Sequence, residues 1–199
     1  MDIRPVVLDG VHVRLEPLSL SHLAALTEIG LDPDLWRWTT QLVRSPQEME
    51  GYIKSALAEQ LRGVALPFAT VHKGAGQGGG ERVVGSTRFG AIEPAHRKVE
   101  IGWTWIGSSW QRSVVNTEAK YLMLRHAFET WGCVRVEFKT DRLNEPSRRA
   151  LLRIGAKEEG ILRSHLITAT GRVRDSVYFS IIAEEWPAVK AGLETTLRG

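Results

Sequence analysis

The sequence predicts one mixed α/β domain spanning residues 1–199. Its segments follow the order strand, two helices, strands, helix, strand, helix and a closing pair of strands, an order typical of α/β and α+β domains. No internal repeat and no linker-like stretch divides the chain. Hydrophobic residues make up 43% and charged residues 25% of the sequence, as in an ordinary globular protein with a sizeable core.

The chain opens with a predicted strand and helix. Residues 11–18 alternate apolar and polar side chains, as a half-buried strand does. Residues 22–30 then form a helical pattern, with Ser19 and Ser21 available as N-caps and Gly30 as its stop.

A second helix is predicted over residues 45–63, where Ser45 is the N-cap, Pro46 takes the first helical position and Glu48 stands at capping-box spacing. Residues 66–73 read as a strand. Five glycines lie in the segment 74–81 that follows. Because no Lys-Ser/Thr pair and no helix come after it, this segment predicts a mobile hairpin tip and not a phosphate loop.

The second half adds strands, two helices and a hairpin. Asn144 is the expected cap of the second of these helices, with Pro146 in its first turn and Gly155 at its end. The predicted ranges are strands 82–92, 98–107 and 134–140, helices 116–131 and 144–155, and a strand pair within 160–182 that turns at 169–172.

Charge and composition exclude several classes of function. The formal net charge is +3 and the 26 basic residues are spread along the chain, so the sequence predicts no direct nucleic-acid partner. Its single cysteine, Cys133, permits no intramolecular disulfide, and a buried, inert thiol is expected there. The N-terminus lacks a signal-peptide core, no run is long enough to span a membrane, and the six histidines have no metal-ligand spacing. These observations predict a cytoplasmic protein without a metal site.

The second half also carries a family pattern. The stretches "VEIGWTWIGSSWQRSVVNTEAKYLMLRHAFE" and "VEFKTDRLNEPSRRALLRIGAKEEG" resemble the acyl-CoA-binding core of the GNAT N-acetyltransferase superfamily. Together with "LDGVHVRLEPL" and "DSVYFSIIAEEW", they are most similar to the branch named for the Rim ribosomal-protein N-terminal acetyltransferases. The resemblance implies a central, mostly antiparallel mixed sheet that splays open after the strand holding Glu100, flanked by helices.

The resemblance also implies where acetyl-CoA binds. Its pantetheine arm would pair with the strand end near residues 105–107, and its pyrophosphate would lie over the helix start, where N–H groups are unpaired. The expected small residues are replaced by Val114, Val115 and Asn116, so the loop would bind anions in ordinary helical geometry or bind them poorly. The alternative is a surface turn capped by Asn116 or Ser113. The predicted cofactor-binding residues are Trp105, Ile106, Gly107, Gln111, Arg112, Ser113, Val114, Val115, Asn116, Thr117, Asn144 and Ser147.

Further residues are assigned roles in the reaction by the same resemblance. Glu100, expected on one strand face with Gly102 and Thr104, is the candidate base, with a solvated glutamate as the alternative. Ser147 is the candidate acid, or else a first-turn residue. Tyr178 would reach the same thioester, or pack in the sheet.

Two tryptophans complete the predicted site. Trp36 and Trp38 would form one wall of the acceptor site, although either side chain could instead anchor its loop on the core.

The predicted function is transfer of acetyl from acetyl-CoA to a primary amine by direct attack in a ternary complex, because no activated nucleophile is evident. The acceptor is left open between a peptide N-terminus and a small amine. A degenerate fold of the same kind, acting as a CoA-binding or regulatory module without catalysis, is the alternative. The hairpin and the tryptophans would allow a homodimer.

Overall fold

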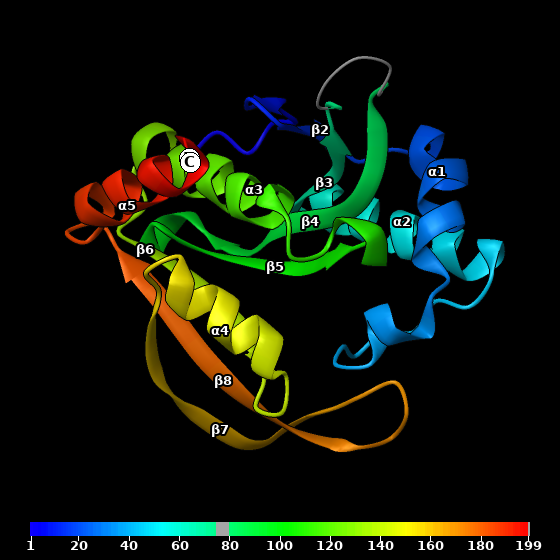
Figure 1. The fold of residues 1–199 in the computed structure, drawn as a ribbon. Helices are drawn as coiled ribbons and strands as arrows, with labels where there is room; N and C mark the ends of the chain where they lie inside the picture. Colours follow the sequence, from blue (N-terminus) through cyan, green and yellow to red (C-terminus); the bar gives the residue numbers. More distant parts are fainter. Residues whose placement is uncertain (75–79, 199) are drawn as a thin grey trace.

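The computed structural model describes residues 1–74 and 80–198 and contains one eight-stranded sheet (Figure 1). The strand order is β1-β2-β3-β4-β5-β6-β8-β7. All neighbours are antiparallel except the parallel pair β5 and β6. The strands are β1 (Leu8–Asp9), β2 (Val13–Pro17), β3 (Leu66–His72), β4 (Arg82–Glu93), β5 (Lys98–Ile106), β6 (Arg135–Asp141), β7 (Lys157–Ile167) and β8 (Val173–Ile182). The predicted mixed, mostly antiparallel sheet is therefore confirmed.

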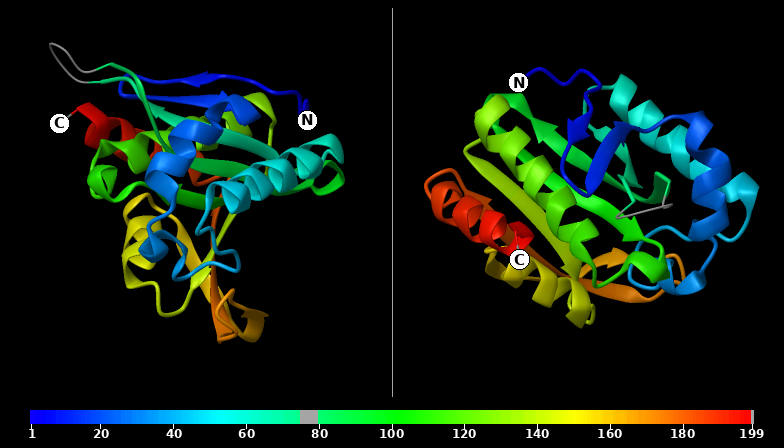
Figure 2. Two further views of the ribbon diagram at one scale, coloured as in Figure 1. Left: turned by 90° about the vertical axis from the view of Figure 1, so that its right-hand side faces the viewer. Right: turned by 45° about the horizontal axis from the view of Figure 1, so that its top comes forward.

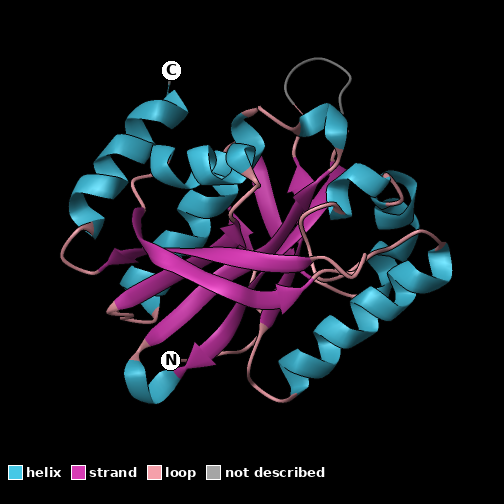
Figure 3. Ribbon diagram, turned by 90° about the horizontal axis from the view of Figure 1, so that it is seen from below, coloured by secondary structure: helices cyan, strands magenta, loops and turns pink. Residues whose placement is uncertain are grey.

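Helices cover both faces of this sheet (Figures 2 and 3). The core between α3, α4, α5 and one face contains Phe89, Leu122 and Phe138, whereas the core under α1 and α2 contains Met49 and Trp105. None of the helices in the described part of the chain is long and apolar enough to span a membrane. The helices are α1 (Leu23–Gly30), α2 (Pro46–Leu61), α3 (Val114–Arg125), α4 (Glu145–Arg153) and α5 (Trp186–Arg198).

Local capping signals set the starts of α2 and α4 as predicted. The Ser45 side chain accepts a hydrogen bond from the Glu48 amide at 3.2 Å, and Pro46 begins α2. The Asn144 side chain accepts one from the Ser147 amide at 3.2 Å. Each bond satisfies an N–H group that the helix itself leaves unpaired.

Other elements differ from the predicted ones. Helix α3 begins at Val114, two residues before the predicted start, because Ser113 is the N-cap and accepts from the Val115 amide at 3.3 Å. A π-helical turn, His126–Thr130, continues it. Strand β1 and helix α5 were not predicted. Of the glycine-rich segment 74–81, residues 75–79 lie outside the described residues.

Glu118 joins α3 to the turn between β1 and β2. Its carboxylate accepts hydrogen bonds from the amides of Val11, His12 and Val13 at 2.8, 2.7 and 2.6 Å. Gly10 leaves room for this carboxylate, since a Cβ there would lie 2.8 Å from it. A buried carboxylate that accepts three backbone N–H bonds stabilises the turn through charge-assisted hydrogen bonds.

We expect Glu118→Gln to lower the free energy of unfolding by about 2–4 kcal/mol. The glutamine NH₂ is itself a donor, so it would face backbone N–H groups that then have no acceptor. Urea unfolding followed by circular dichroism measures this loss. Glu194→Gln is the control: Glu194 accepts one bond, from the Tyr121 hydroxyl at 2.8 Å, on a more exposed site. Equal losses in the two variants would contradict the role given to Glu118.

Candidate functional site

The sheet opens between β5 and β6. Their ladder pairs Lys98–Glu100 with residues 135–137, and no further pair between these strands is recorded in the described residues. β6 nevertheless stays paired with β8 along its whole length to Asp141. Figure 1 shows the two strands diverging. We call this stretch, residues 101–106 of β5 and 138–141 of β6, the split. Among the residues that the structure places, the backbone groups of β5 on this side have no strand partner, so they can bind an extended ligand.

A β-bulge lies in β5 at the split. Gly102 pairs with Arg88 and Trp105 with Ser86, so both Trp103 and Thr104 stand opposite Thr87. Trp103 takes the extra position, with φ at 50°. Bulges of this kind redirect side chains and often lie beside functional sites.

The bulge corrects one prediction about the faces of β5. Glu100 and Gly102 face the α2 side of the sheet, as does Trp105, whose side chain lies in the core under α2. Thr104 faces α3 instead, since its hydroxyl contacts Lys120 of that helix. The expected common face of Glu100, Gly102 and Thr104 is therefore wrong for Thr104, because the extra residue reverses the alternation.

Glu100 is buried beside the split, with 6% of its surface exposed. Its Oε2 accepts a hydrogen bond from Lys139 Nζ at 3.1 Å. Its Oε1 lies over Gly102, where a Cβ would come within 2.9 Å of it. Tyr178 pairs with Lys139 across β8 and β6, and the Lys139 Nζ lies 5.7 Å from the centre of its ring. The structure thus brings together the predicted Glu100 and Tyr178, and it adds Lys139.

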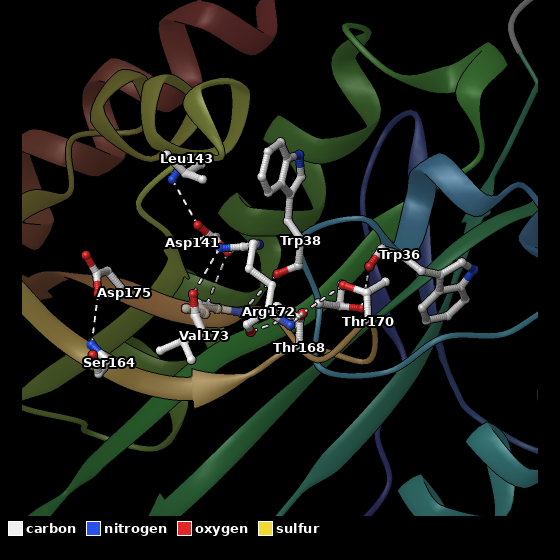
Figure 4. Close-up of polar contacts among 12 residues, drawn as sticks. Trp36, Trp38, Asp141, Leu143, Ser164, Thr168, Thr170, Arg172, Val173 and Asp175 are labelled. Carbon is white, nitrogen blue, oxygen red and sulfur yellow. Dashed lines mark hydrogen bonds and ion pairs between the residues drawn. The ribbon is translucent and has the colours of Figure 1, made fainter.

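A charged cluster closes the far end of β6 (Figure 4). The Asp141 carboxylate is fully buried; it binds Arg172, lies 3.9 Å from Arg174 Nε and accepts a bond from the Leu143 amide at 2.9 Å. Burial lowers the pKa of Arg174, while Asp141 and then Glu100 act in the opposite direction. Sequence reasoning missed this cluster, although two arginines alternating before "DSVYFS" were a signal for a charged strand face.

Arg174 also holds the loop between α1 and α2. Its Nη1 donates to the Trp38 carbonyl at 3.0 Å, and the Trp38 ring stacks under the guanidinium groups of Arg37 and Arg172 at 5.0 and 5.7 Å. Trp38 therefore lies beside the end of β8, on the same side as the charged cluster.

Trp36 has different surroundings. It is buried, its indole N–H donates to the Gly30 carbonyl at 2.8 Å, and its ring centre lies 5.5 Å from those of Tyr52 and Trp105. These contacts anchor the loop on the core, the alternative that the sequence left open for this residue.

The loop after β5 enters α3 in helical geometry. Val115 is fully buried in the core, and the left-handed backbone position falls instead on Arg112, with φ at 59°. The side chain of Gln111 donates to the Ile106 carbonyl at 3.0 Å, and that of Ser113 donates to the Trp110 carbonyl at 2.6 Å. The groups left for an anion are the remaining first-turn amides of α3 and the exposed side chain of Arg112.

The residues at the start of α4 lie where β6 ends. Asn144 follows Asp141 by a tight turn, its amide donating to the Asp141 carbonyl at 3.0 Å. Its side chain caps α4 on the Ser147 amide. Ser147 is half-buried in the first turn, so the cap role of Asn144 and a role near the split are compatible.

We expect Arg112→Gly to raise the free energy of unfolding by about 0.5–1 kcal/mol, because glycine adopts the left-handed conformation without strain. If acetyl-CoA binds at this helix start, as the resemblance implies, its affinity should fall about threefold to tenfold through loss of the cation. Calorimetry and urea unfolding measure the two effects. Arg112→Ala is the matched variant, since it loses the charge but keeps the strain. Equal stability of the two variants would contradict this account of the turn.

Comparisons with known proteins agree with this architecture. Residues 12–157 match the family model described as the acetyltransferase (GNAT) domain. A candidate acetyltransferase from T. thermophilus is 38% identical with a TM-score of 0.88, over 99% of this chain and 100% of that one. Mycobacterium smegmatis RimJ, solved in complex with CoA-disulfide, is 28% identical with a TM-score of 0.79, over 96% of this chain and 92% of that one.

A curated relative matches over a shorter range. The uncharacterized N-acetyltransferase YoaA of Bacillus subtilis is 28% identical over 102 residues, which span 51% of this chain and 56% of YoaA. The family model covers well over half of this sequence, and RimJ agrees with the resemblance to the Rim branch. On the sheet with its split and on these matches, the chain belongs to the GNAT acetyltransferase domain family.

Proposed function

We propose that this protein transfers an acetyl group from acetyl-CoA to a primary amine. The observation that carries the proposal is a buried carboxylate, Glu100, at the point where β5 and β6 separate. Acylation of an amine needs a place to hold the acyl donor and a group that accepts the proton of the amine. The free edge of β5 and the Glu100 carboxylate lie close enough to serve these two purposes. The complex of RimJ with CoA-disulfide supports a CoA ligand in this family.

The residues of the split fit acetyl-CoA. The free edge of β5 can hydrogen-bond an extended amide-containing arm, and the α3 N-terminus with Arg112 can hold phosphates. When bound, acetyl-CoA supplies the acetyl group as an activated thioester. The backbone near Gly107 would polarise the acyl carbonyl, and the cap residues Asn144 and Ser147 would border the arm.

The acceptor amine would approach from the α2 side, where Glu100 points. An amine is nucleophilic only when neutral, and its pKa is about 7.7–8.0 for an N-terminus and about 10.4 for a lysine. Glu100 would take the ammonium proton, while Lys139 holds the carboxylate in place. Tyr178 borders the same space, and Trp38 would form its outer wall.

The acyl group would pass directly to the amine. The cysteine is an unsuitable nucleophile, because Cys133 is buried and burial raises the pKa of its thiol to about 11. Cys133 would therefore not carry the acyl group, and both substrates would bind before the reaction.

Two measurements test the proposal. Calorimetry with acetyl-CoA should show binding, and thiol release should depend on an added amine. A panel of peptides with free N-termini and of small amines separates the two acceptor classes. Binding without thiol release for any amine would favour the regulatory module, for which the glycine-free loop is the support. Absence of binding at high micromolar acetyl-CoA would overturn the proposal. A cytoplasmic location and a homodimer remain expectations of the sequence.

A further inference from the structure

Helix α3 carries a buried lysine beside the split. Lys120 has 5% of its surface exposed, and its Nζ donates to the Thr104 hydroxyl at 2.6 Å. No ion pair of Lys120 is recorded among the residues that the structure describes. The neighbouring helix residues Ala119 and Met123 belong to the apolar core, so an apolar side chain would suit this position better.

Burial has a direct electrostatic consequence. It lowers the pKa of Lys120 to about 7, while the charge of Glu100 acts in the opposite direction. A lysine of this kind exchanges its proton near neutral pH, which an exposed lysine does not do.

Within the described ranges, the other elements packed against α3 place no partner charge on Lys120. Strand β2 packs Val13 and Leu15 into the core with the helix. The charged groups nearby are engaged elsewhere: Glu118 with the amides of Val11, His12 and Val13, Glu194 with Tyr121, Glu129 with Lys190, and Asp9 with Lys73. Glu100 of β5 is the charged group that acts on Lys120.

Thr104 links this amine to the split. It lies past the last β5 residue paired with β6, and it is partly exposed. Its hydroxyl also lies 2.8 Å from that of Thr87 and 3.4 Å from the Gly102 carbonyl. Because of the bulge, Thr104 opens to the α3 side and Glu100 to the α2 side. The split therefore has the Glu100 carboxylate on one face and the Thr104 hydroxyl, bonded to Lys120, on the other.

We propose that Lys120 is a positioning residue that acts through Thr104, orienting its hydroxyl and supplying the proton taken up by the departing sulfur on the α3 side. This assigns to Thr104 the acid role that the resemblance offered to Ser147, which leaves Ser147 as a first-turn residue of α4. This inference rests on the proposed function. The acyl carbon gains its bond to the amine nitrogen and loses its bond to sulfur, whose electron pair takes the Thr104 hydroxyl proton. Thr104 regains a proton from Lys120, which becomes neutral. The amine proton goes to Glu100 and then to solvent, and Lys120 is reprotonated from solvent.

Four variants and one control test the proposal. Lys120→Met removes the proton and fills the space with an apolar chain. Lys120→Arg keeps a charge that does not give up its proton. Thr104→Val removes the linking hydroxyl, and Thr104→Ser retains it. Lys54→Met is the control, because Lys54 is exposed on α2 in a pair with Glu50.

We expect Lys120→Met, Lys120→Arg and Thr104→Val to lower kcat about 10²-fold with little change in KM for acetyl-CoA. Thr104→Ser, which keeps the hydroxyl, should retain most of the wild-type kcat. The ratio of wild-type to Lys120→Met kcat should be constant below pH 7 and fall above it, because the donor is then deprotonated. Lys54→Met should keep wild-type kinetics. Wild-type kcat in both Lys120→Met and Thr104→Val would overturn the proposal.

Thermal unfolding gives a readout that needs no turnover. The folded pKa of Lys120 lies below its ordinary value of 10.5, so the unfolded chain binds more protons between about pH 7 and 10.5. The melting temperature of the wild type relative to Lys120→Met should therefore rise with pH across this window. A difference independent of pH would overturn the inference. If the wild type neither binds acetyl-CoA nor releases thiol, the proposed function fails instead, whatever the melting temperatures show.

Discussion

Replacing Glu100 with glutamine is expected to lower kcat about 10²–10⁴-fold, the usual contribution of a general base. The glutamine keeps the size of the side chain beside Gly102 and Lys139 but does not take a proton from the amine. Acetyl-CoA affinity should stay within about threefold of wild type, since Glu100 faces the α2 side of the split. Thiol release with a reactive peptide or amine measures the first effect, and calorimetry measures the second.

Glu137→Gln is the matched control for this experiment. Glu137 is the parallel-strand partner of Glu100, but its carboxylate binds Arg135 at 2.7 Å on the paired part of the sheet. Its removal should leave kcat within about twofold of wild type. If both variants lose activity to the same extent, the fall in kcat on Glu100→Gln comes from removing a negative charge from the sheet. The role of Glu100 as the base would then be wrong.

Replacing Asp141 with asparagine is expected to lower the free energy of unfolding by about 3–5 kcal/mol, because it leaves buried arginine charge without its counter-ion. Arg174 is itself buried, and the same carboxylate also binds Arg172. The variant should also weaken the hold of Arg174 on the Trp38 carbonyl, so KM for the amine should rise. Urea unfolding and amine titrations measure the two changes.

Asp9→Asn provides the comparison for Asp141. Asp9 pairs with Lys73 at 3.0 Å on an exposed surface, where such pairs contribute roughly 0–1 kcal/mol. If Asp141→Asn lowers the free energy of unfolding no more than Asp9→Asn does, the charged cluster does not stabilise the fold. A rise in KM without loss of stability would limit its role to holding the loop.

Predictions made from the sequence were most accurate where the signal is local. The starts of α2 and α4 depend on Ser45 and Asn144, each bonded to an amide three residues away. The resemblance also gave the fold and its opening after Glu100, which the sheet confirms. Helix α5 was not predicted, although Trp186, Val189 and Leu193 have helical spacing.

The reactive geometry needed the tertiary structure. Whether Thr104 faces α2 or α3 depends on one extra residue in β5, and strand alternation alone gives the opposite answer. Trp36 and Trp38 are two residues apart, yet one lies in the core and the other beside β8.

The sequence by itself determined most of the elements and the caps of α2 and α4, because these follow from short-range hydrogen bonds and apolar spacing. Its motifs carried the resemblance that gave the family. Only the tertiary structure decided which charges meet. Asp141 binds Arg172, Arg174 reaches Trp38, and Glu100 binds Lys139, across 31, 136 and 39 positions of the chain. Such partners are set by strand register and helix packing, which no local pattern encodes.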